Sequence, residues 1–320
     1  MNNNTAAFIM PVYTDKFIEF ESTFKKSIDS ILNQTDQNFI LVIVDDKSKD
    51  ESIIQYLESL RKTDNRIHII YSTKNKGPGF ARNLGIKYAH SLNIPFILFN
   101  DADDLSDINR LKETRSKFKD EEVNVVYSSF KVIDENDQIV EYHEICDSIK
   151  EILDGHTHDV VEGEDAWLKI ALEKNYTNLT STTAVRTSLA YLEQFSPRHV
   201  SEDAHTWLRY GAHKGKFSFL NNIYTLYRIR RNTESSSRAR VKNFYKLKAK
   251  TDVEGYKKAE KIFKQKVQCF DKRYLKKCRA KFYFKESISI SLGCEFKTAA
   301  KLLKQALKLN NKVVLEEIIK

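Results

Sequence analysis

Short apolar runs alternate with helical patterns through the first 133 residues, and this alternation constrains the fold more than any other feature of the chain. Runs typical of buried strands are found at residues 6–13, 39–46, 66–72, 95–100 and 123–133. Patterns that predict helices lie between them, at about 20–33, 50–61, 79–91 and 107–119. Such alternation predicts an α/β fold, in which a mostly parallel sheet has helices on both faces and right-handed crossovers.

The alternation fades after about residue 134, so the rest of the chain is expected to be organised differently. Residues 134–165 look loop-rich and acidic. A helix is expected near 164–174, a Thr- and Ser-rich segment follows at 178–188, and another helix is expected to begin at Ser201. From residue 241 the sequence is rich in lysine and mostly helical in pattern.

The composition is that of a globular protein, because 41% of the 320 residues are hydrophobic and 30% are charged. The sequence contains no run of 18 or more apolar residues, and its N-terminus shows no signal-peptide pattern. The four cysteines lack C-x-x-C spacing and indicate free thiols in a reducing compartment. We therefore expect a cytoplasmic protein.

The formal net charge of +9 is unevenly distributed. Residues 238–320 contain 24 Lys and Arg against 8 Asp and Glu, a balance of +16, whereas residues 1–237 contain 29 against 36, a balance of −7. The basic segment predicts contact with an anionic partner. Three interpretations stay open: a solvated helical face, a helix on an anionic membrane surface, and nucleic-acid binding, which has no known motif in its favour.

The stretch NKGPGFARNLG at residues 75–85 resembles the G-x-G-x-x-G loop of dinucleotide-binding proteins. That fingerprint follows the first strand of its sheet and ends on Gly or Ala, whereas this loop follows the third strand and has Arg82 at the last position. A nicotinamide or flavin site is therefore disfavoured. Gly77 and Gly79 could also form a tight turn into a helix and have no further role.

Acidic side chains follow two of the predicted strands, at the edge where an open α/β sheet binds its ligands. Asp45 and Asp46 end the second strand, and Asp101, Asp103 and Asp104 follow the fourth. Carboxylates at i and i+2 can hold a divalent cation that grips a diphosphate, and the absence of nearby Cys or His favours Mg²⁺ or Mn²⁺ over zinc. The alternative is a solvated turn whose Asp caps the next helix.

Five pieces of sequence, taken together, resemble the family-2 glycosyltransferases with the GT-A fold. They are IMPVYT at 9–14, VDDKSKDES at 44–52, NKGPGFARNLG at 75–85, NDADD at 100–104 and SEDAHTW at 201–207. The resemblance covers about residues 6–230 and implies a Rossmann-like, mixed but mostly parallel sheet. It implies a catalytic domain at 1–237, with an acceptor region at about 134–237. Residues 238–320 lie outside the match, and their composition predicts a basic helical C-terminal extension.

The resemblance also implies the residues of a nucleotide-sugar site. Asp203 matches the catalytic base that takes the proton of the acceptor hydroxyl as the anomeric carbon is inverted. Asp103 matches the acid that holds Mn²⁺ or Mg²⁺, and Asp101 matches an acid on the ribose or diphosphate side. The other matching positions are Pro11, Val12 and Tyr13 at the nucleoside, Asp46 at a uracil ring, and Asn75 and Arg82 at the nucleotide and its phosphates.

One position departs from the family pattern. The family often carries Tyr-Arg-x-His after the base, whereas this chain reads YRIRRNTESSS at 227–237 and has Arg230 in place of the histidine. A guanidinium cannot bind a cation, but it can pair with a phosphate. Arg230 is therefore predicted to bind the nucleotide without contacting a metal.

These features predict a metal-dependent inverting glycosyltransferase that moves a sugar from a nucleotide-sugar donor, a UDP-sugar above all, to a hydroxyl of a growing surface glycan. The acceptor could be a free, lipid-linked or protein-linked glycan, and the basic extension could place the enzyme at the inner face of the cell membrane. Two alternatives remain. One is a catalytically inactive nucleotide-binding scaffold, and the other is a sugar nucleotidyltransferase, although MPVYTDK at 10–16 lacks the Gly-rich basic loop expected there.

Overall fold

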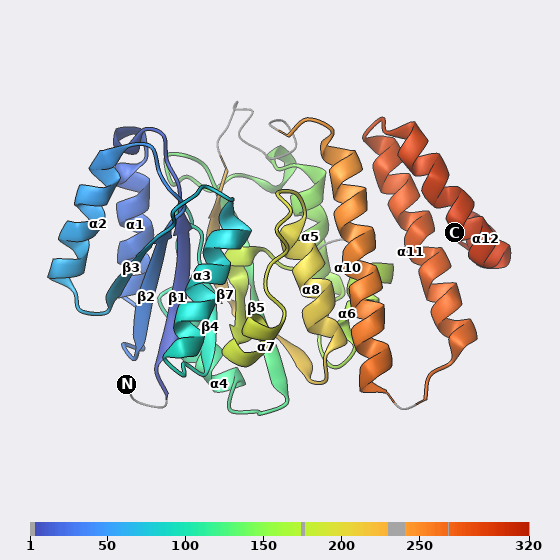
Figure 1. Ribbon diagram of the computed structural model, residues 1–320, viewed down its shortest axis with the longest axis horizontal. Coiled ribbons are helices and arrows are strands. Elements are labelled where there is room, and N and C mark those ends of the chain that lie inside the picture. Colours follow the sequence, from blue (N-terminus) through green and yellow to red (C-terminus); the bar gives the residue numbers. More distant parts are fainter. Residues whose placement is uncertain (1–3, 174–176, 230–240, 268, 320) are drawn as a thin grey trace.

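The computed structural model describes residues 4–173, 177–229, 241–267 and 269–319. A seven-stranded sheet flanked by helices fills one part of the molecule, and three long C-terminal helices stand at its other end (Figure 1). The strand order is β3-β2-β1-β4-β6-β5-β7. The predicted α/β architecture with a helical C-terminal extension is confirmed.

The first four strands pair in parallel: β1 (Ala6–Val12), β2 (Phe39–Asp45), β3 (Ile67–Tyr71) and β4 (Phe96–Phe99). The other three are β5 (Val123–Ile133), β6 (Thr183–Arg186) and β7 (Lys216–Arg228). Strand β6 runs antiparallel to both of its neighbours, whereas β7 is parallel to β5. The sheet is therefore mixed but mostly parallel, as predicted.

Helices cover both faces of the sheet, because alternate side chains of each buried strand point to opposite faces. Phe8 and Met10 of β1 pack into the core under α1 (Glu21–Leu32), α2 (Glu51–Thr63) and α4 (Arg110–Lys117). Ala7 and Ile9 pack into the opposite core under α3 (Pro78–Ser91), α6 (Ala166–Leu172) and α8 (Glu202–Ala212). Both sets of apolar side chains were visible as strand and helix patterns in the sequence.

The prediction that residues 134–165 are loop-rich is wrong for part of this range. Helix α5 (Asp147–His158) lies there, after the short 3-10 helix η2 (Tyr142–Glu144). Its apolar residues Ile149, Ile152 and Leu153 pack on Phe130 of β5. Only a few apolar positions among many acids face inward, so the helical pattern was weak. The remaining short elements are η1 (Phe17–Glu19), η3 (Thr180–Thr182) and α7 (Thr187–Leu192).

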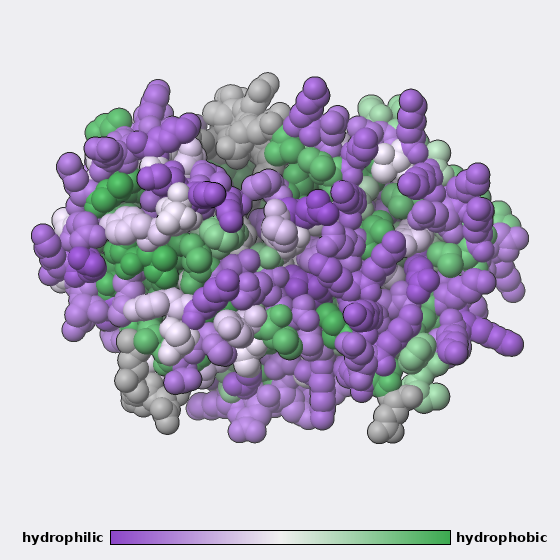
Figure 2. All heavy atoms as spheres, viewed as in Figure 1, coloured by the Kyte–Doolittle hydropathy of each residue, from purple (hydrophilic) through white to green (hydrophobic). Residues whose placement is uncertain are grey.

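The C-terminal helices are α10 (Phe244–Lys266), α11 (Lys272–Leu292) and α12 (Phe296–Ile319). They pack on the rest of the chain mainly through α10 against α8, with further contacts of α11 with α6. Gly255 lets α10 and α8 approach closely, since a Cβ at this position would lie 3.0 Å from the Cα of His205. Tyr256 stacks on Phe282 of α11, with ring centroids 4.3 Å apart. Hydrophilic residues cover most of the visible face of these helices (Figure 2). Among the described residues, no helix is both long and apolar enough to cross a bilayer.

Candidate active site

The carboxyl ends of β1, β2 and β4 open into a cleft of about 2040 Å³. Parallel pairing places these strand ends at one edge of the sheet, so the loops that follow them meet there. Arg230 lies outside the described residues. Every other predicted site residue lines the cleft: Pro11, Val12, Tyr13, Asp46, Asn75, Arg82, Asp101, Asp103 and Asp203.

The end of β2 is tied to the glycine-containing loop by Asp46. Its buried carboxylate accepts hydrogen bonds from the backbone N–H groups of Lys76 and Gly77, at 3.0 and 2.6 Å. Burial raises the pKa of Asp46, although these two backbone donors act in the opposite direction. Asp46 therefore fixes the loop that carries Asn75, and its predicted contact with a uracil ring stays a prediction.

Gly77 makes the turn into α3 possible. Its φ angle is +88°, and a Cβ at this position would lie 2.8 Å from Nδ1 of His199. Backbone in this region strains any residue that has a side chain. The tight turn is therefore present at Gly77, and Arg82 reaches the cleft from the first turns of α3.

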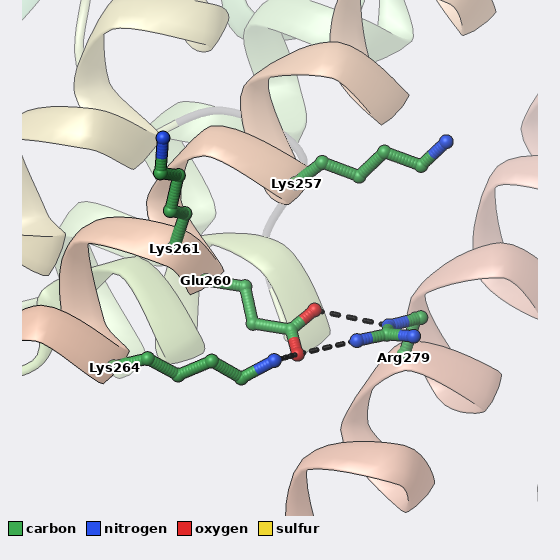
Figure 3. Close-up of a pocket in the computed structure, with 5 residues that line it drawn as sticks. All are labelled: Lys257, Glu260, Lys261, Lys264 and Arg279. Carbon is green, nitrogen blue, oxygen red and sulfur yellow. Dashed lines mark hydrogen bonds and ion pairs between the residues drawn. The ribbon is translucent and has the colours of Figure 1, made fainter.

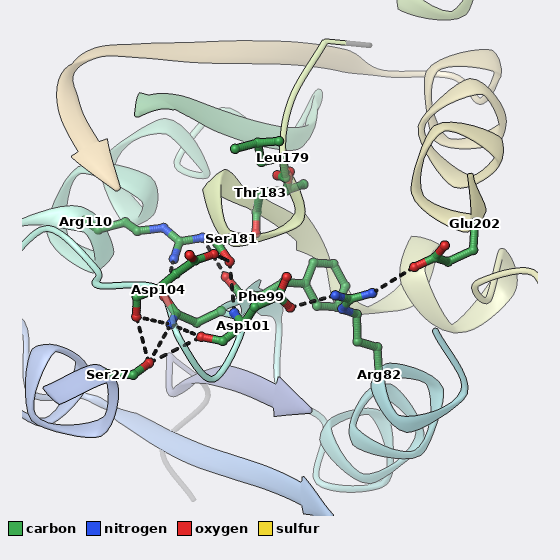
Figure 4. A network of polar contacts seen from close by, with 11 residues as sticks. Ser27, Arg82, Phe99, Asp101, Asp104, Arg110, Leu179, Ser181, Thr183 and Glu202 are labelled. Atoms are coloured by element: carbon green, nitrogen blue, oxygen red, sulfur yellow. Dashed lines mark hydrogen bonds and ion pairs between the residues drawn. The ribbon is translucent and has the colours of Figure 1, made fainter. Parts of the chain in front are cut away.

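Arg82 lies between the acidic turn after β4 and the start of α8 (Figure 4). Its side chain is 4% exposed and forms ion pairs with Asp101 at 2.6 Å and with Glu202 at 3.4 Å. Among the described residues, its buried Nε has no hydrogen-bond partner. The guanidinium thus connects two segments that are far apart in the sequence, and its pairing with a phosphate stays a prediction.

The acidic turn after β4, residues 101–104, is anchored to the interior of the protein by Asp104. Its buried carboxylate accepts hydrogen bonds from Ser181 Oγ at 2.5 Å and from the backbone N–H of Arg228 at 2.8 Å. Burial, with the nearby charges of Asp103 and Asp101, raises the pKa of Asp104 well above its usual range. The fully buried Arg110 also donates to the backbone oxygen of Phe99 at 2.9 Å. These contacts orient Asp101 and Asp103 toward the cleft while Asp104 points into the protein.

Asp101 and Asp103 are the acids of this turn that could take part in metal binding. Within the described ranges, no group of three or more His, Cys, Asp or Glu side chains is placed to hold a metal ion by itself. Mg²⁺ is usually bound by one or two carboxylates together with substrate phosphates, not by an all-protein cage. This pair of acids therefore fits a site that a bound diphosphate would complete.

Asp203 lies in the first turn of α8 and lines the cleft. Its Oδ1 accepts a hydrogen bond from the backbone N–H of Ala204 at 2.8 Å. Burial, and then the charge of Glu202, raises the pKa of Asp203 to about 7. A carboxylate with such a pKa can accept a proton effectively near neutral pH.

The residue before α8, Ser201, is fixed by the C-terminal helices. Ser201 has a left-handed backbone, with φ of 60°, and its hydroxyl donates to Asp252 of α10 at 2.6 Å. Asp252 also pairs with Lys248 at 2.5 Å, and Lys248 lies 3.9 Å from Glu286 of α11. All four residues are buried. This network links the helix that carries Asp203 to residues beyond the part of the chain in which the sequence indicated a site.

The side of the cleft away from the strand ends is formed by α5, α10 and α11. Sequence reasoning assigned no site residues to this side, because these helices carry no motif and meet the cleft only through packing. The residues that line it include Asp147, Glu151 and Ile152 of α5, Phe244, Tyr245 and Lys248 of α10, and Lys285, Ile288 and Leu292 of α11.

A second, smaller pocket of about 300 Å³ lies between α10 and α11 (Figure 3). Glu260 is its central residue and pairs with Arg279 and Lys264, each at 2.5 Å. Lys257 and Lys261 complete its lining. The acid is fully engaged by its own cations, and none of these residues lines the large cleft.

A mixed, mostly parallel sheet of this kind, with an acidic turn in a cleft at its carboxyl edge, is the arrangement of the GT-A glycosyltransferases. The chain belongs to glycosyl transferase family 2, whose model matches residues 7–179, more than half of its length.

The Escherichia coli enzyme UDP-Glc:alpha-D-GlcNAc-diphosphoundecaprenol beta-1,3-glucosyltransferase WfgD is 32% identical over 136 residues. That match covers 42% of this chain and 49% of the relative, so the chain spans about half the length of that protein. An uncharacterized glycosyltransferase of Methanocaldococcus jannaschii is 24% identical over 248 residues, 77% of this chain and 78% of that one.

Two solved structures share the fold along almost the whole chain. S. aureus TarS 1–349 in complex with UDP-GlcNAc has a TM-score of 0.59 and 17% identity, and the match covers 98% of this chain and 91% of that one. The mannosyltransferase PcManGT from Pyrobaculum calidifontis, in complex with GDP-Man and Mn²⁺, has a TM-score of 0.55 and 15% identity, covering 95% and 75%. At these identities the likeness shows the fold alone.

Proposed function

We propose that the protein is a metal-dependent, inverting glycosyltransferase that moves a sugar from a UDP-sugar to a hydroxyl of a growing surface glycan. The observation that carries this proposal is the position of Asp203 in the same cleft as Asp101 and Asp103. The residue proposed as the base and the acids proposed for the diphosphate end of the donor thus line the same cleft. The choice of UDP is supported by the E. coli relative, whose name specifies UDP-Glc, and by the UDP-GlcNAc bound to TarS.

Asp203 would take the proton of the acceptor hydroxyl as the hydroxyl oxygen attacks the anomeric carbon of the donor sugar. The bond to the nucleoside diphosphate would break on the opposite face of that carbon, which inverts its configuration. Because its pKa is about 7, Asp203 is partly ionised at neutral pH and gains a proton readily once the acceptor oxygen becomes positive.

The donor would lie along the strand ends. Pro11, Val12, Tyr13 and Asp46 would hold the nucleoside, and Asn75, Arg82, Asp101 and Arg230 would hold the ribose and phosphates. Arg82 would share its N–H groups between the diphosphate and its present partners, Asp101 and Glu202. Asp103 would hold Mn²⁺ or Mg²⁺, and the bound ion would stabilise the charge that develops on the departing diphosphate.

The acceptor is proposed to be a lipid-linked glycan at the inner, cytoplasmic face of the cell membrane. The E. coli relative supports this class, because its name describes GlcNAc joined through a diphosphate to undecaprenol. Residues 1–237 would form the catalytic unit, and the basic residues 238–320 would contact anionic lipid. Sedimentation with anionic vesicles at moderate salt tests this contact, and a chain that stays in the supernatant contradicts it.

A panel of UDP-, GDP- and dTDP-sugars with Mg²⁺ or Mn²⁺ tests the proposed function. We expect a metal-dependent increase in melting temperature with at least one UDP-sugar, and slow release of UDP as water replaces the acceptor. Binding without any release of UDP would indicate an inactive scaffold. Formation of a nucleotide-sugar from a sugar phosphate and a nucleoside triphosphate would instead indicate a nucleotidyltransferase.

A further inference from the structure

The C-terminal helices contribute part of the cleft lining, which we call the helical wall. It consists of Phe244, Tyr245 and Lys248 of α10 and Lys285, Ile288, Ser289 and Leu292 of α11. Four of these seven residues belong to α11, whose last residue, Leu292, is 80% exposed. A ligand that reacts at Asp203 could therefore continue along this wall to the surface.

The outer end of the helical wall is apolar and open. Ile288 is 47% exposed, Leu292 is 80% exposed, and Phe296, at the start of α12, is 67% exposed. Tyr245 packs beside this end, because a Cβ on Gly293 would lie 2.3 Å from its ring. Hydrophobic surface is visible near these ends of the helices in Figure 2. Apolar side chains that are exposed together at the mouth of a cleft are typical of a binding surface.

The helical wall contains a cationic side chain, Lys285, that forms no hydrogen bond with the described residues. The Nζ atom of Lys285 is buried and has no hydrogen-bond partner in the described part of the chain. Burial lowers the pKa of Lys285 to about 8, although Glu151 and Glu286 act to raise it. Lys248 differs, since it is paired with Asp252 at 2.5 Å. A buried ammonium that lacks a partner costs free energy unless a ligand supplies an anion.

The part of the cleft lining that α5 contributes, on the same side as the helical wall, has the other charge. Glu144, Asp147 and Glu151 line it near and along α5. Carboxylates accept hydrogen bonds from sugar hydroxyls, but they repel phosphate. An anionic group in the cleft is therefore favoured at the helical wall and disfavoured at α5.

The rim near the helical wall is basic. Lys242 is exposed just before α10, Lys246 and Lys250 are exposed in its first turns, and Lys297 is exposed at the start of α12. Lysines around exposed apolar side chains suit the anionic surface of a bilayer, which attracts each nearby lysine by about 1 kcal/mol. A ligand that leaves the cleft along Leu292 would reach this basic rim.

We propose that the helical wall binds an acceptor whose sugar is joined through a phosphate or diphosphate to a lipid, with the phosphate at Lys285 and the first part of the lipid along Ile288 and Leu292. This inference rests on the proposed function, because it names the acceptor class and the acceptor subsite of the same cleft. A buried cation followed by an open apolar path matches an amphiphile with an anionic head. A polyol-phosphate polymer would use the cation but not the apolar path.

Farnesyl diphosphate is a suitable probe, because it carries a diphosphate and a lipid chain without a sugar. The full chain would first be saturated with UDP and Mg²⁺, so that the diphosphate site of the donor is filled. Binding of farnesyl diphosphate would then be measured by isothermal titration calorimetry. Lys285→Gln should weaken binding by about tenfold or more, because a charge-assisted contact is lost. Lys285→Arg should keep most of the affinity, and Lys277→Gln, at an exposed position on the same helix, should change nothing.

A second pair of variants tests the apolar path. Leu292→Ser should weaken binding by about threefold, since only part of this side chain would be covered by the lipid. The matched control is Leu315→Ser, at a 54% exposed position of α12 that does not line the cleft. Both leucines are too exposed for their loss to unfold the protein, and UDP affinity measured on each variant confirms that it is folded.

Equal affinity of Lys285→Gln and the unchanged chain would overturn the assignment of the phosphate. Equal binding of inorganic diphosphate and farnesyl diphosphate would overturn the lipid part and favour a polyol phosphate. Failure of farnesyl diphosphate to bind the UDP-loaded protein would overturn the whole inference. Release of UDP from the donor is scored separately, so these outcomes are distinguishable from failure of the proposed function.

Discussion

The two sides of the cleft are built in different ways. The side proposed for the donor follows the ends of β1, β2 and β4, whose strand residues are all buried in the sheet. The side proposed for the acceptor is assembled from α5, α8, α10 and α11, which are held together by contacts such as the one between Ser201 and Asp252. We call them the donor side and the acceptor side. The family model ends at residue 179, so α8, α10 and α11 lie beyond it. Residues of the proposed nucleotide site are therefore placed by local motifs on a buried sheet, whereas those of the proposed acceptor site are placed by the packing of helices that are distant in the sequence.

The strongest way to separate the two sides is to remove the proposed base. Asp203→Asn should lower the rate of sugar transfer by about 10²- to 10⁴-fold, the usual contribution of a general base. The affinity for UDP with metal should change little, because Asp203 belongs to the acceptor side. Transfer assays and UDP titrations on the same preparation check both parts. Undiminished transfer would exclude Asp203 from this role.

The complementary variant is Asp103→Ala, which should weaken binding of the donor nucleotide. We expect metal-dependent UDP binding to weaken by about tenfold to a hundredfold, because a carboxylate that holds the cation is lost. Titration of UDP at several Mn²⁺ concentrations measures this effect. Asp147→Ala is the matched control, since this fully exposed acid lines the other side of the cleft. If both variants bind UDP equally well, the division into two sides is incorrect.

In the unchanged protein, the pH dependence of kcat/KM should follow the ionisation of the proposed base, Asp203. Burial raises the pKa of Asp203 to about 7, and only its ionised form can accept a proton. We therefore expect kcat/KM to increase about tenfold as the pH rises from 6 to 8, while UDP affinity stays nearly constant. A profile that is flat over this range would show that another group takes the proton.

The smallest effect is expected for Asp252→Asn, which perturbs the link from the C-terminal helices to α8. Transfer should fall by about threefold to tenfold, because the hydrogen bond from Ser201 is weakened. The charge of Asp252 also contributes to the raised pKa of Asp203, so the acidic limb of the pH profile should move to lower pH. If Asp252 only supports the structure, the transfer rate should fall but the acidic limb of the pH profile should not move. Glu254→Gln serves as the control, because this acid of the same helix pairs with Lys258 and Arg198 and does not line the cleft.

Much of the donor side could be predicted from the sequence. Asp46, Asp101 and Asp103 follow strongly apolar strands, and the parallel sheet necessarily brings such strand ends together. Arg110 and Ser181 could not be identified in the same way. Arg110 lies within an ordinary polar helix, and Ser181 is one hydroxyl in a Thr- and Ser-rich segment. Their contacts with the acidic turn appear only once the chain is folded.

The acceptor side could be predicted only in part. The acids at the start of α8 were visible in SEDAHTW, but Ser201 finds its partner in Asp252, 51 residues later. Strands β6 and β7 and helix α5 were not predicted, because their apolar patterns are short or are interrupted by polar residues. Lys285 is one of many lysines in a basic segment. Its burial depends on the packing of α11 against the cleft, which no local pattern indicates.

The double pairing of Arg82 has a consequence for the speed of donor binding. A guanidinium whose charge is already matched by Asp101 and Glu202 exerts little attraction at a distance. A diphosphate would meet Arg82 by exchanging partners at close range, after it has entered the cleft. The association rate of UDP should therefore depend only weakly on ionic strength, whereas its dissociation rate should respond to the loss of either acid. Stopped-flow measurements at several salt concentrations would show whether Arg82 mainly slows the dissociation of UDP or mainly speeds its association.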